Sequence, residues 1–354
     1  MEGAAERKLS YQPPAKLTRV EHIAGTVAFV NGVSGNGKTM LAPIVGSLAR
    51  VELMRFNYHL EHICQLRYLN LIDDNVAVSL ASVQIDLDLY NSMMSRETNF
   101  RFSDLSSAWK NCRPWRYFVR LFGAGDGAVI SRIREERPIL HLVTHSLLGI
   151  SHPLFKALGD RLRILELVRH PLYLIKQWRV LMTRDHSDPR VFYLCVDYHG
   201  RSLPWFAHGW EELYLRSNLM DRSIYAIRQQ WRLAEEAFER LSDIQKKQVL
   251  FIPFERFVTE PDPFVDEIVR FLGTETTRVT RRVMKSQNVP RRMYAEGIDL
   301  GIYKRYGWEP PSAGATEQEE LAKRRDFVAS EAAPEALQVL DELSAAYEAK
   351  YLRA

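Results

Sequence analysis

The chain has 354 residues, of which 46% are hydrophobic and 26% charged, and its formal net charge is +4. This composition is typical of an ordinary globular protein with a large core. The small positive excess suits an anionic ligand but does not indicate a nucleic-acid polymer as partner. No stretch approaches the roughly 20 apolar residues that a membrane span requires, so we expect none.

Residues 1–20 contain charged side chains and the pair Pro13-Pro14 but no apolar block. They lack the pattern of a secretory signal, and we expect a short mobile tail there. The three cysteines, Cys64, Cys112 and Cys195, are too few and too scattered for a disulfide framework. This favours a reducing compartment, and we therefore expect a cytoplasmic protein.

Apolar runs and helical patterns alternate after this tail. Runs typical of buried strands lie at Gly25–Val30, Arg137–His145, Arg161–Pro171 and Gln248–Glu255. Helical spacing covers residues 40–48, 58–94 and 224–241, and Pro171 favours a helix start. The alternation predicts an α/β fold: a parallel sheet flanked by helices, in the three-layer arrangement of proteins with a phosphate-binding loop.

The last part of the chain has a different composition. The stretch "EPPSAGAT" (Glu309–Thr316) is typical of a linker. We therefore divide the chain into the tail, an α/β domain over residues 21–309, and a linker with charged helices over residues 310–354. Pro334 would open the second of these helices. Its apolar face (Leu337, Leu340, Tyr347 and Tyr351) suits packing on the domain or on a second copy of the chain, and the sequence leaves both open.

The stretch "VNGVSGNGKTML" (Val30–Leu41) has the spacing Gly-x-x-x-x-Gly-Lys-Thr of a phosphate-binding loop, placed between a strand and a helix. Glycines let backbone N–H groups turn toward an anion, and the following helix adds its positive end. The sequence therefore predicts a phosphorylated nucleotide as ligand. The candidate binding residues are Ser34, Gly35, Asn36, Gly37, Lys38, Thr39 and Met40.

A kinase or nucleoside triphosphatase would also place an acidic residue near Mg²⁺ at the end of a buried strand. The predicted strands instead end at His145, Arg169 and Glu255, which points away from phosphoryl transfer. Asp73 and Asp74 read as a helix terminus. His59, His62 and Cys64 lack the spacing of a zinc site, and we expect no metal.

Four stretches in this order resemble the sulfotransferases that use 3′-phosphoadenosine 5′-phosphosulfate (PAPS). They are the loop "SGNGKTM", the strand end "VTHSL" (Val143–Leu147), "LELVRHPLYLI" (Leu165–Ile175) and "FERFVTEPDPFVDEIVRFLG" (Phe254–Gly273). In the family these correspond to the phosphate loop, a "KTH"-like strand end, a strand that runs into "RNP" or "RDP", and a "YEDL…P…FLG" segment. The resemblance covers residues 26–273, most of the chain.

The resemblance implies a sulfuryl transfer from PAPS, as co-substrate, to a hydroxyl or amine acceptor. His145 would take the acceptor proton, which suits an imidazole at neutral pH. Lys38 would neutralise the phosphate oxygens as the S–O bond breaks. Arg169 would grip the 3′-phosphate, helped by Gln177 and by a basic segment at Arg291 and Arg292. Glu255 reads as a structural acid.

Two positions depart from the family pattern. The family loop reads like "PKSGTTW", whereas here Gly35 stands at the lysine position and Lys38 replaces the first threonine. Gln177 also stands where the family has a serine that binds the 3′-phosphate. Both departures concern donor recognition, and the loop as it stands looks more like that of a kinase.

The acceptor is expected to be a small molecule or a carbohydrate. Residues 90–127 and 184–213 would shape its site, and the second stretch holds basic and aromatic side chains that can stack on sugars (Arg184, His186, Trp205, His208 and Trp210). Two other functions stay open at this stage. One is an ATP- and Mg²⁺-dependent small-molecule kinase, and the other is a nucleotide-binding module without chemistry whose helical tail docks to a partner.

Overall fold

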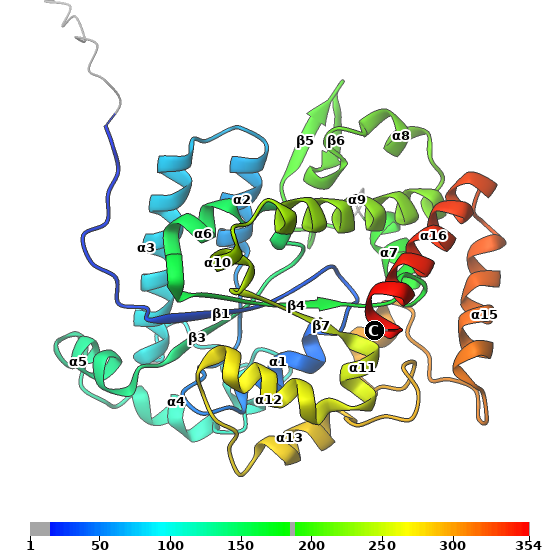
Figure 1. The fold of residues 1–354 in the computed structure, drawn as a ribbon. Coiled ribbons are helices and arrows are strands. Elements are labelled where there is room, and N and C mark those ends of the chain that lie inside the picture. The colour runs from blue at the N-terminus through cyan, green and yellow to red at the C-terminus, as the bar shows by residue number, and fades with distance from the viewer. Residues whose placement is uncertain (1–14, 185–187, 354) are drawn as a thin grey trace, which may run out of the picture.

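The computed structural model of the chain describes residues 15–184 and 188–353. Its centre is a five-stranded sheet in the order β2-β3-β1-β4-β7, in which all neighbours are parallel (Figure 1). The strands are β1 Thr26–Asn31, β2 Arg55–Phe56, β3 Ile139–Val143, β4 Leu162–Val168 and β7 Val249–Pro253. The four strands predicted from apolar runs are confirmed, whereas the two-residue β2 is too short to leave a sequence signal.

Alternate residues of β1 pack on opposite faces of the sheet. Val27 and Phe29 belong to one apolar cluster, and Ala28 and Val30 to another. Both faces of a parallel sheet are covered by helices, so its strands are apolar throughout. The three-layer α/β architecture predicted from the sequence is therefore confirmed.

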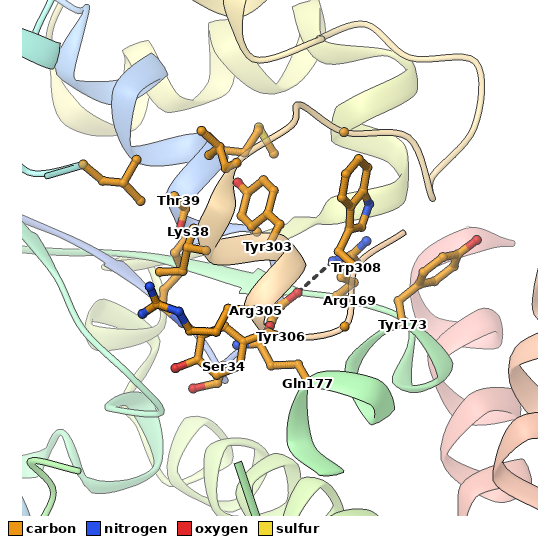
Figure 2. Close-up of a pocket in the computed structure, with 18 of the residues that line it drawn as sticks. Ser34, Lys38, Thr39, Arg169, Tyr173, Gln177, Tyr303, Arg305, Tyr306 and Trp308 are labelled. Carbon is orange, nitrogen blue, oxygen red and sulfur yellow. Dashed lines mark hydrogen bonds between the residues drawn. The ribbon is translucent and has the colours of Figure 1, made fainter. Parts of the chain in front are cut away.

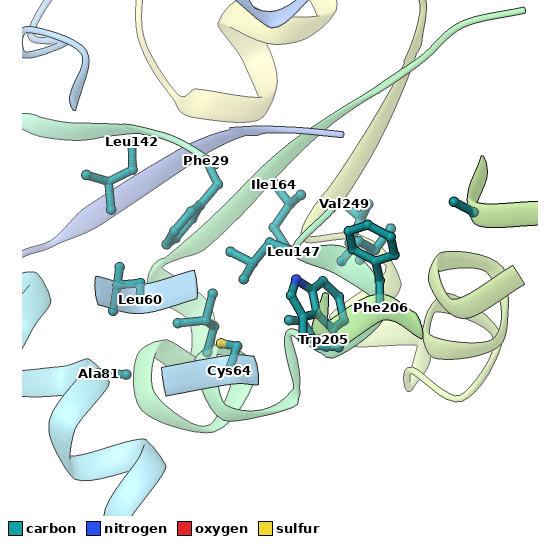
Figure 3. Packing of buried hydrophobic residues seen from close by; sticks show 14 of the residues in the cluster. Phe29, Leu60, Cys64, Ala81, Leu142, Leu147, Ile164, Trp205, Phe206 and Val249 are labelled. Carbon is teal, nitrogen blue, oxygen red and sulfur yellow. The ribbon is translucent and has the colours of Figure 1, made fainter. Parts of the chain in front are cut away.

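The first cluster receives buried side chains from one set of helices, as Figure 3 shows for residues around Phe29, Leu60 and Cys64. These helices are α2 Tyr58–Tyr68, α3 Asp74–Met93, α5 Asp126–Glu136, α6 His152–Leu158, α7 Pro171–Arg184 and α9 Leu219–Glu239. The second cluster receives side chains from α1 Lys38–Gly46, α11 Phe254–Thr259, α12 Pro261–Leu272 and α13 Thr280–Ser286. Asp73 caps α3, as the sequence predicts.

Shorter elements connect these layers. They are α4 Pro114–Arg120, α8 Glu211–Arg216, α10 Asp243–Lys246, α14 Gly301–Arg305 and the 3₁₀ turns η1 Ala108–Lys110, η2 Leu148–Ile150, η3 Gly159–Arg161 and η4 Trp205–Ala207. An antiparallel hairpin, β5 Cys195–Tyr198 and β6 Arg201–Pro204, stands apart from the main sheet. None of the helices in the described residues combines the length and apolar character needed to cross a membrane.

The C-terminal helices pack on the α/β body, beside α7 and α9 (Figure 1). They are α15 Glu317–Ala329 and α16 Pro334–Tyr347, followed by the π-helical η5 Glu348–Leu352. Leu340 is fully buried in the first cluster. The Tyr347 hydroxyl donates to Glu255, and its ring lies 5.9 Å from that of Trp231. Of the two sites left open for the apolar face of α16, the body of the same chain is the one observed.

Only the last residues of the predicted N-terminal tail belong to the described part of the chain. Residues 1–14 lie outside the described part of the chain. Beyond them, Leu17 N donates to Asn75 Oδ1 at 2.8 Å, and Arg19 pairs with Asp86 at 2.7 Å. Residues 17 and 19 are thus held against α3, although the sequence prediction assigned them to the mobile tail.

Candidate functional site

The site lies where the sheet order reverses. β1 is central, and the chain continues to β3 on one side and to β4 on the other. The carboxyl ends of these three strands meet at one edge, the position where open α/β sheets bind ligands. Asn31, at the end of β1, forms hydrogen bonds to β4 and to the loop that follows β3. Its side-chain oxygen accepts from Thr144 Oγ1 and Leu147 N, both at 3.0 Å, and its amide donates to Glu166 Oε2 at 2.6 Å.

The phosphate-binding loop depends on glycines in the left-handed region. Gly37 has φ 99°, and a Cβ there would lie 2.5 Å from the ring of Phe254. Gly32 has φ 133°, and its Cβ would lie 2.4 Å from Leu167 O. A side chain at either position would combine backbone strain with a steric clash. The loop therefore lies directly against β4 and α11.

The loop presents unused backbone donors. The amides of Gly35, Gly37, Lys38 and Thr39 have no acceptor among the described residues, whereas Met40 N donates to Gly37 O at 2.9 Å. The first three of these amides precede or begin α1, whose N-terminal end is positive. The arrangement is that of an anion cradle.

Lys38 is folded back onto this loop. Its ammonium group donates to Gly32 O at 2.6 Å, Val33 O at 2.9 Å and Asn36 Oδ1 at 3.4 Å. Burial lowers the pKa of Lys38 to about 8, against the opposing charges of Glu166 and Glu61. Lys38 thus borders the cavity, and its ammonium group is already surrounded by oxygen acceptors. A bound phosphate would offer it acceptors of the same kind.

His145 follows β3 and is positioned by a buried acid. Glu61 Oε1 accepts from His145 N at 2.9 Å and lies 3.1 Å from His145 Nδ1. The rings of Phe56 and Tyr58 stack on the imidazole, each with its centroid 6.2 Å away. With Nδ1 held by a carboxylate, Nε2 is left as the proton acceptor, the usual arrangement for a general base.

Arg169 follows β4 and reaches back to the loop. Its Nη1 donates to Gly35 O at 2.8 Å, while its buried Nε has no partner among the described residues. The guanidinium carbon lies 4.0 Å from the centroid of the Phe254 ring and 5.0 Å from that of Tyr173. Burial lowers the pKa of Arg169, the charge of Glu255 raises it, and that of Arg324 lowers it again. An unpartnered buried donor fits an anionic ligand.

These groups border one cavity of about 730 Å³, a size that suits a nucleotide-sized ligand. Figure 2 shows Lys38 and Thr39 at one end, Tyr173 at the other, and Tyr303, Tyr306 and Trp308 between them. The cavity is strongly cationic. Among the described residues that line it, two are carboxylates, Asp104 and Glu296, and six are lysines or arginines, namely Lys38, Arg169, Lys176, Arg291, Arg305 and Arg324.

The structure brings most of the predicted site residues to this cavity. Its lining includes Ser34, Gly35, Gly37, Lys38, Thr39, Met40, His145, Arg169, Gln177 and Arg291. Asn36 and Arg292 are the exceptions. Asn36 is fully buried and its amide donates to Leu167 O, so it braces the loop from behind. Arg292 is exposed to solvent, whereas its neighbour Arg291 lies against the Phe254 ring.

The two stretches predicted to shape the acceptor site differ in their relation to this cavity. Residues 103–106 of the first stretch line the cavity, but no described residue of 188–213 does. Trp205 is buried in the core, Trp210 Nε1 donates to Phe206 O at 2.7 Å, and His208 lies 3.0 Å from Glu211. These side chains pack the β5–β6 region instead. His186 and the Arg184 side chain lie outside the described residues.

Several site residues were missed by sequence reasoning. Glu61 contacts His145 from a segment 84 residues away, and no short pattern links the two. Tyr173, Phe254, Tyr303, Arg305, Trp308 and Arg324 also line the cavity. Phe254 lies inside the last predicted strand (Gln248–Glu255) and opens the fourth of the resembling stretches, and these two signals marked its position. No group of three or more metal-ligating side chains occurs within residues 15–184 and 188–353.

Neither a protein-family model nor a curated protein matches this chain. Matching solved structures include the sulfotransferase domain of the Synechococcus PCC 7002 olefin synthase, at 15% identity and TM-score 0.41, covering 95% of this chain and 98% of that one. Mouse sulfotransferase SULT7A1 complexed with PAP matches at 13% identity and TM-score 0.35, covering 93% and 86%. A sulfotransferase from Alicyclobacillus acidocaldarius matches at 14% identity and TM-score 0.34, covering 90% and 95%.

Proposed function

We propose that this chain is a sulfotransferase that moves a sulfuryl group from PAPS to a hydroxyl or amine of a small acceptor. The observation that carries the proposal is the shared cavity. His145, held by Glu61, borders the same space as Lys38, the loop amides and the cationic wall at Arg169. The proton acceptor suits removal of the proton from the acceptor molecule, the loop suits the 5′-phosphosulfate, and the separate cluster of arginines suits the 3′-phosphate.

In the proposed reaction, the loop amides and Lys38 hold the 5′-phosphosulfate, and Arg169 and Arg291 hold the 3′-phosphate. The acceptor oxygen or nitrogen attacks sulfur while the bond between sulfur and the 5′-phosphate oxygen breaks. His145 Nε2 takes the acceptor proton. The products are the sulfated acceptor and 3′,5′-adenosine bisphosphate (PAP). Lys38 stabilises the charge that develops on the leaving phosphate.

The acceptor would enter beside His145, where Phe56 and Tyr58 offer aromatic faces. Leu105 and Leu181 add apolar surface to the lining of the cavity. This wall supports a hydroxylated acceptor with a ring, such as a carbohydrate or an aromatic compound, since both stack on aromatic side chains.

Calorimetric titration tests the donor assignment. The wild-type chain is titrated with PAP, ATP and ADP, each in EDTA and in Mg²⁺. We expect PAP to bind equally well in both buffers. Arg169→Ala should weaken PAP binding about 10- to 100-fold, since a charge-assisted hydrogen bond is lost, whereas Arg179→Ala, a charge change outside the cavity lining, should not. Binding of ATP only with Mg²⁺ would overturn the proposal and favour the kinase.

A second experiment separates an enzyme from a nucleotide-binding module. PAP release from PAPS is measured across a panel of hydroxylated acceptors. His145→Asn should reduce turnover about 10²- to 10⁴-fold, as the loss of a general base does, and leave the Kd for PAP unchanged. His152→Asn is the matched control, because His152 is exposed and faces Asp74. Equal turnover in the wild type and His145→Asn would remove the base role.

A further inference from the structure

Three arginines and two aromatic rings alternate along one wall of the cavity. The guanidinium carbon of Arg324 lies 4.3 Å from the centroid of the Tyr173 ring, and that of Arg169 lies 5.0 Å from the same centroid. Arg169 also lies 4.0 Å from the Phe254 ring, and Arg291 lies 5.5 Å from it. All five side chains line the cavity. Cation–π contacts of this kind hold guanidinium groups in place. Arg291 is also held by backbone carbonyls, because its three guanidinium nitrogens donate to Asn288 O, Glu296 O and Gln287 O.

Arg324 reaches this wall from the C-terminal extension. It lies on α15, beyond the linker, and is only 8% exposed. Glu317 of the same helix links α15 to the body of the chain. It accepts from Tyr173 OH at 2.7 Å and also from Tyr294 N. The helices beyond residue 310 therefore contribute directly to the cavity as well as covering the body.

In the part of the chain that the structure describes, two guanidinium groups of this wall keep an unpaired buried nitrogen. Arg324 Nη2 pairs with Glu320 Oε1 at 2.6 Å, but the buried Nε atoms of Arg324 and Arg169 have no partner among the described residues. The nearby Glu255 is already occupied, because it accepts from His170 N and Tyr347 OH. Burial and, after it, the positive charge of Arg169 lower the pKa of Arg291 to about 10, although Tyr303 and Glu296 act in the opposite direction. An anion with several acceptor oxygens would satisfy the unpaired donors and reduce this repulsion.

We propose that Arg324 is a donor-binding residue, which joins Arg169 and Arg291 in holding the 3′-phosphate, so that docking of α15 is coupled to donor binding. The inference rests on the proposed function. It adds that the C-terminal helices are a working part of the donor site. By thermodynamic linkage, the nucleotide then stabilises the docked position of α15 by the same factor by which docking strengthens binding.

Calorimetry with two nucleotides tests the role of Arg324. PAP carries the 3′-phosphate and 5′-AMP lacks it. Arg324→Gln should weaken PAP binding about 10- to 100-fold and AMP binding less than about 3-fold. Arg325→Gln is the matched control, since Arg325 is the next residue on the helix and pairs with Asp341 at the surface. Unchanged PAP binding, or an equal loss of PAP and AMP binding, would overturn the inference.

A second variant acts on Arg324 without removing it. Glu320→Gln frees the guanidinium from its partner, and PAP should then bind more tightly; weaker or equal binding would contradict a ligand role. Hydrogen exchange provides an independent readout, in which PAP should slow the exchange of α15 amides in the wild type and not in Arg324→Gln. A wild-type chain that binds no PAP would instead reject the donor assignment itself, and the two failures are therefore distinct.

Discussion

Buried charged residues are held in the site by specific partners. Glu255 is fully buried and accepts from His170 N and Tyr347 OH, which agrees with the structural role predicted for it. Glu166 lies behind the phosphate loop, where burial raises its pKa to about 7 against the effects of its bond from Asn31 and the charge of Lys38. Glu166 does not line the cavity. It therefore acts on Lys38 through charge and does not face the ligand.

The pKa of Lys38, lowered to about 8, gives two pH effects of opposite sign. Above pH 8 the lysine loses its charge, so PAP affinity should fall about 10-fold or more between pH 7 and 9.5. Unfolding restores the ordinary value of 10.5, so the unfolded chain binds more protons between pH 8 and 10.5, and this residue makes stability rise with pH there. Calorimetry at both pH values should show a smaller fall for Lys38→Arg. An equal fall in wild type and variant would assign the effect to another group.

The carboxylate of Glu61 is expected to orient His145 without contacting substrate. Glu61→Gln keeps an oxygen that can accept from His145 N but removes the carboxylate beside Nδ1 that favours one tautomer of the imidazole. Turnover should fall about 10-fold, with an unchanged Kd for PAP. Glu61→Asp should restore part of the rate. A loss of stability with unchanged turnover would indicate that Glu61 only supports the fold.

At the scale of single elements, the sequence predicted the features that depend on a short segment and missed the contacts between residues far apart in the chain. The glycine spacing, the strand that precedes it and the basic or imidazole residues after β3 and β4 are short patterns with a fixed physical meaning. Tyr173 and Glu317, by contrast, meet across 144 residues. Arg324 sits in a charged helix that resembles any solvated surface helix. Arg324 becomes part of the cavity wall because α15 packs on α7. No short sequence pattern predicts such a contact between two helices.

The docking of α16 can be measured by truncating one side chain. Leu340 is fully buried in the first apolar cluster, and Leu340→Ala should cost about 2–5 kcal/mol of unfolding free energy. Gln338 is exposed on the same helix, and Gln338→Ala should change stability by less than about 0.5 kcal/mol. Urea denaturation measures both. Equal small effects would mean that α16 does not pack as described.

At the scale of the whole molecule, the order of the sheet determines where the chemistry can occur. With β1 between β3 and β4, three loops from distant parts of the sequence converge at one edge. The sequence allowed this convergence to be predicted, because parallel strands share their carboxyl edge. It did not predict that residues 297–308 would line the same cavity, because that segment has no helical or strand periodicity of its own.

Ligand binding at this edge should stabilise the entire fold. PAP at about 100 times its Kd should add about 2.7 kcal/mol and raise the Tm by a few degrees, equally in EDTA and in Mg²⁺. Differential scanning fluorimetry with AMP as the comparison measures this. The AMP shift at equal concentration should be smaller, since it lacks the group for the arginine wall. A Tm shift that requires Mg²⁺ would contradict a metal-independent donor site.

Trp308 borders the cavity, and its indole N–H donates to Ala295 O at 3.0 Å. An indole held at the edge of the proposed nucleotide site would let the binding of a nucleotide be followed by the intrinsic fluorescence of the protein. Adenine stacking or a change in local polarity would alter the emission of Trp308, while emission from the exposed Trp115 would respond to quenchers in solvent and not to nucleotide. Comparison of the wild type with Trp308→Phe would isolate this signal. Binding rates could then be followed by stopped flow without a label, before any acceptor is known.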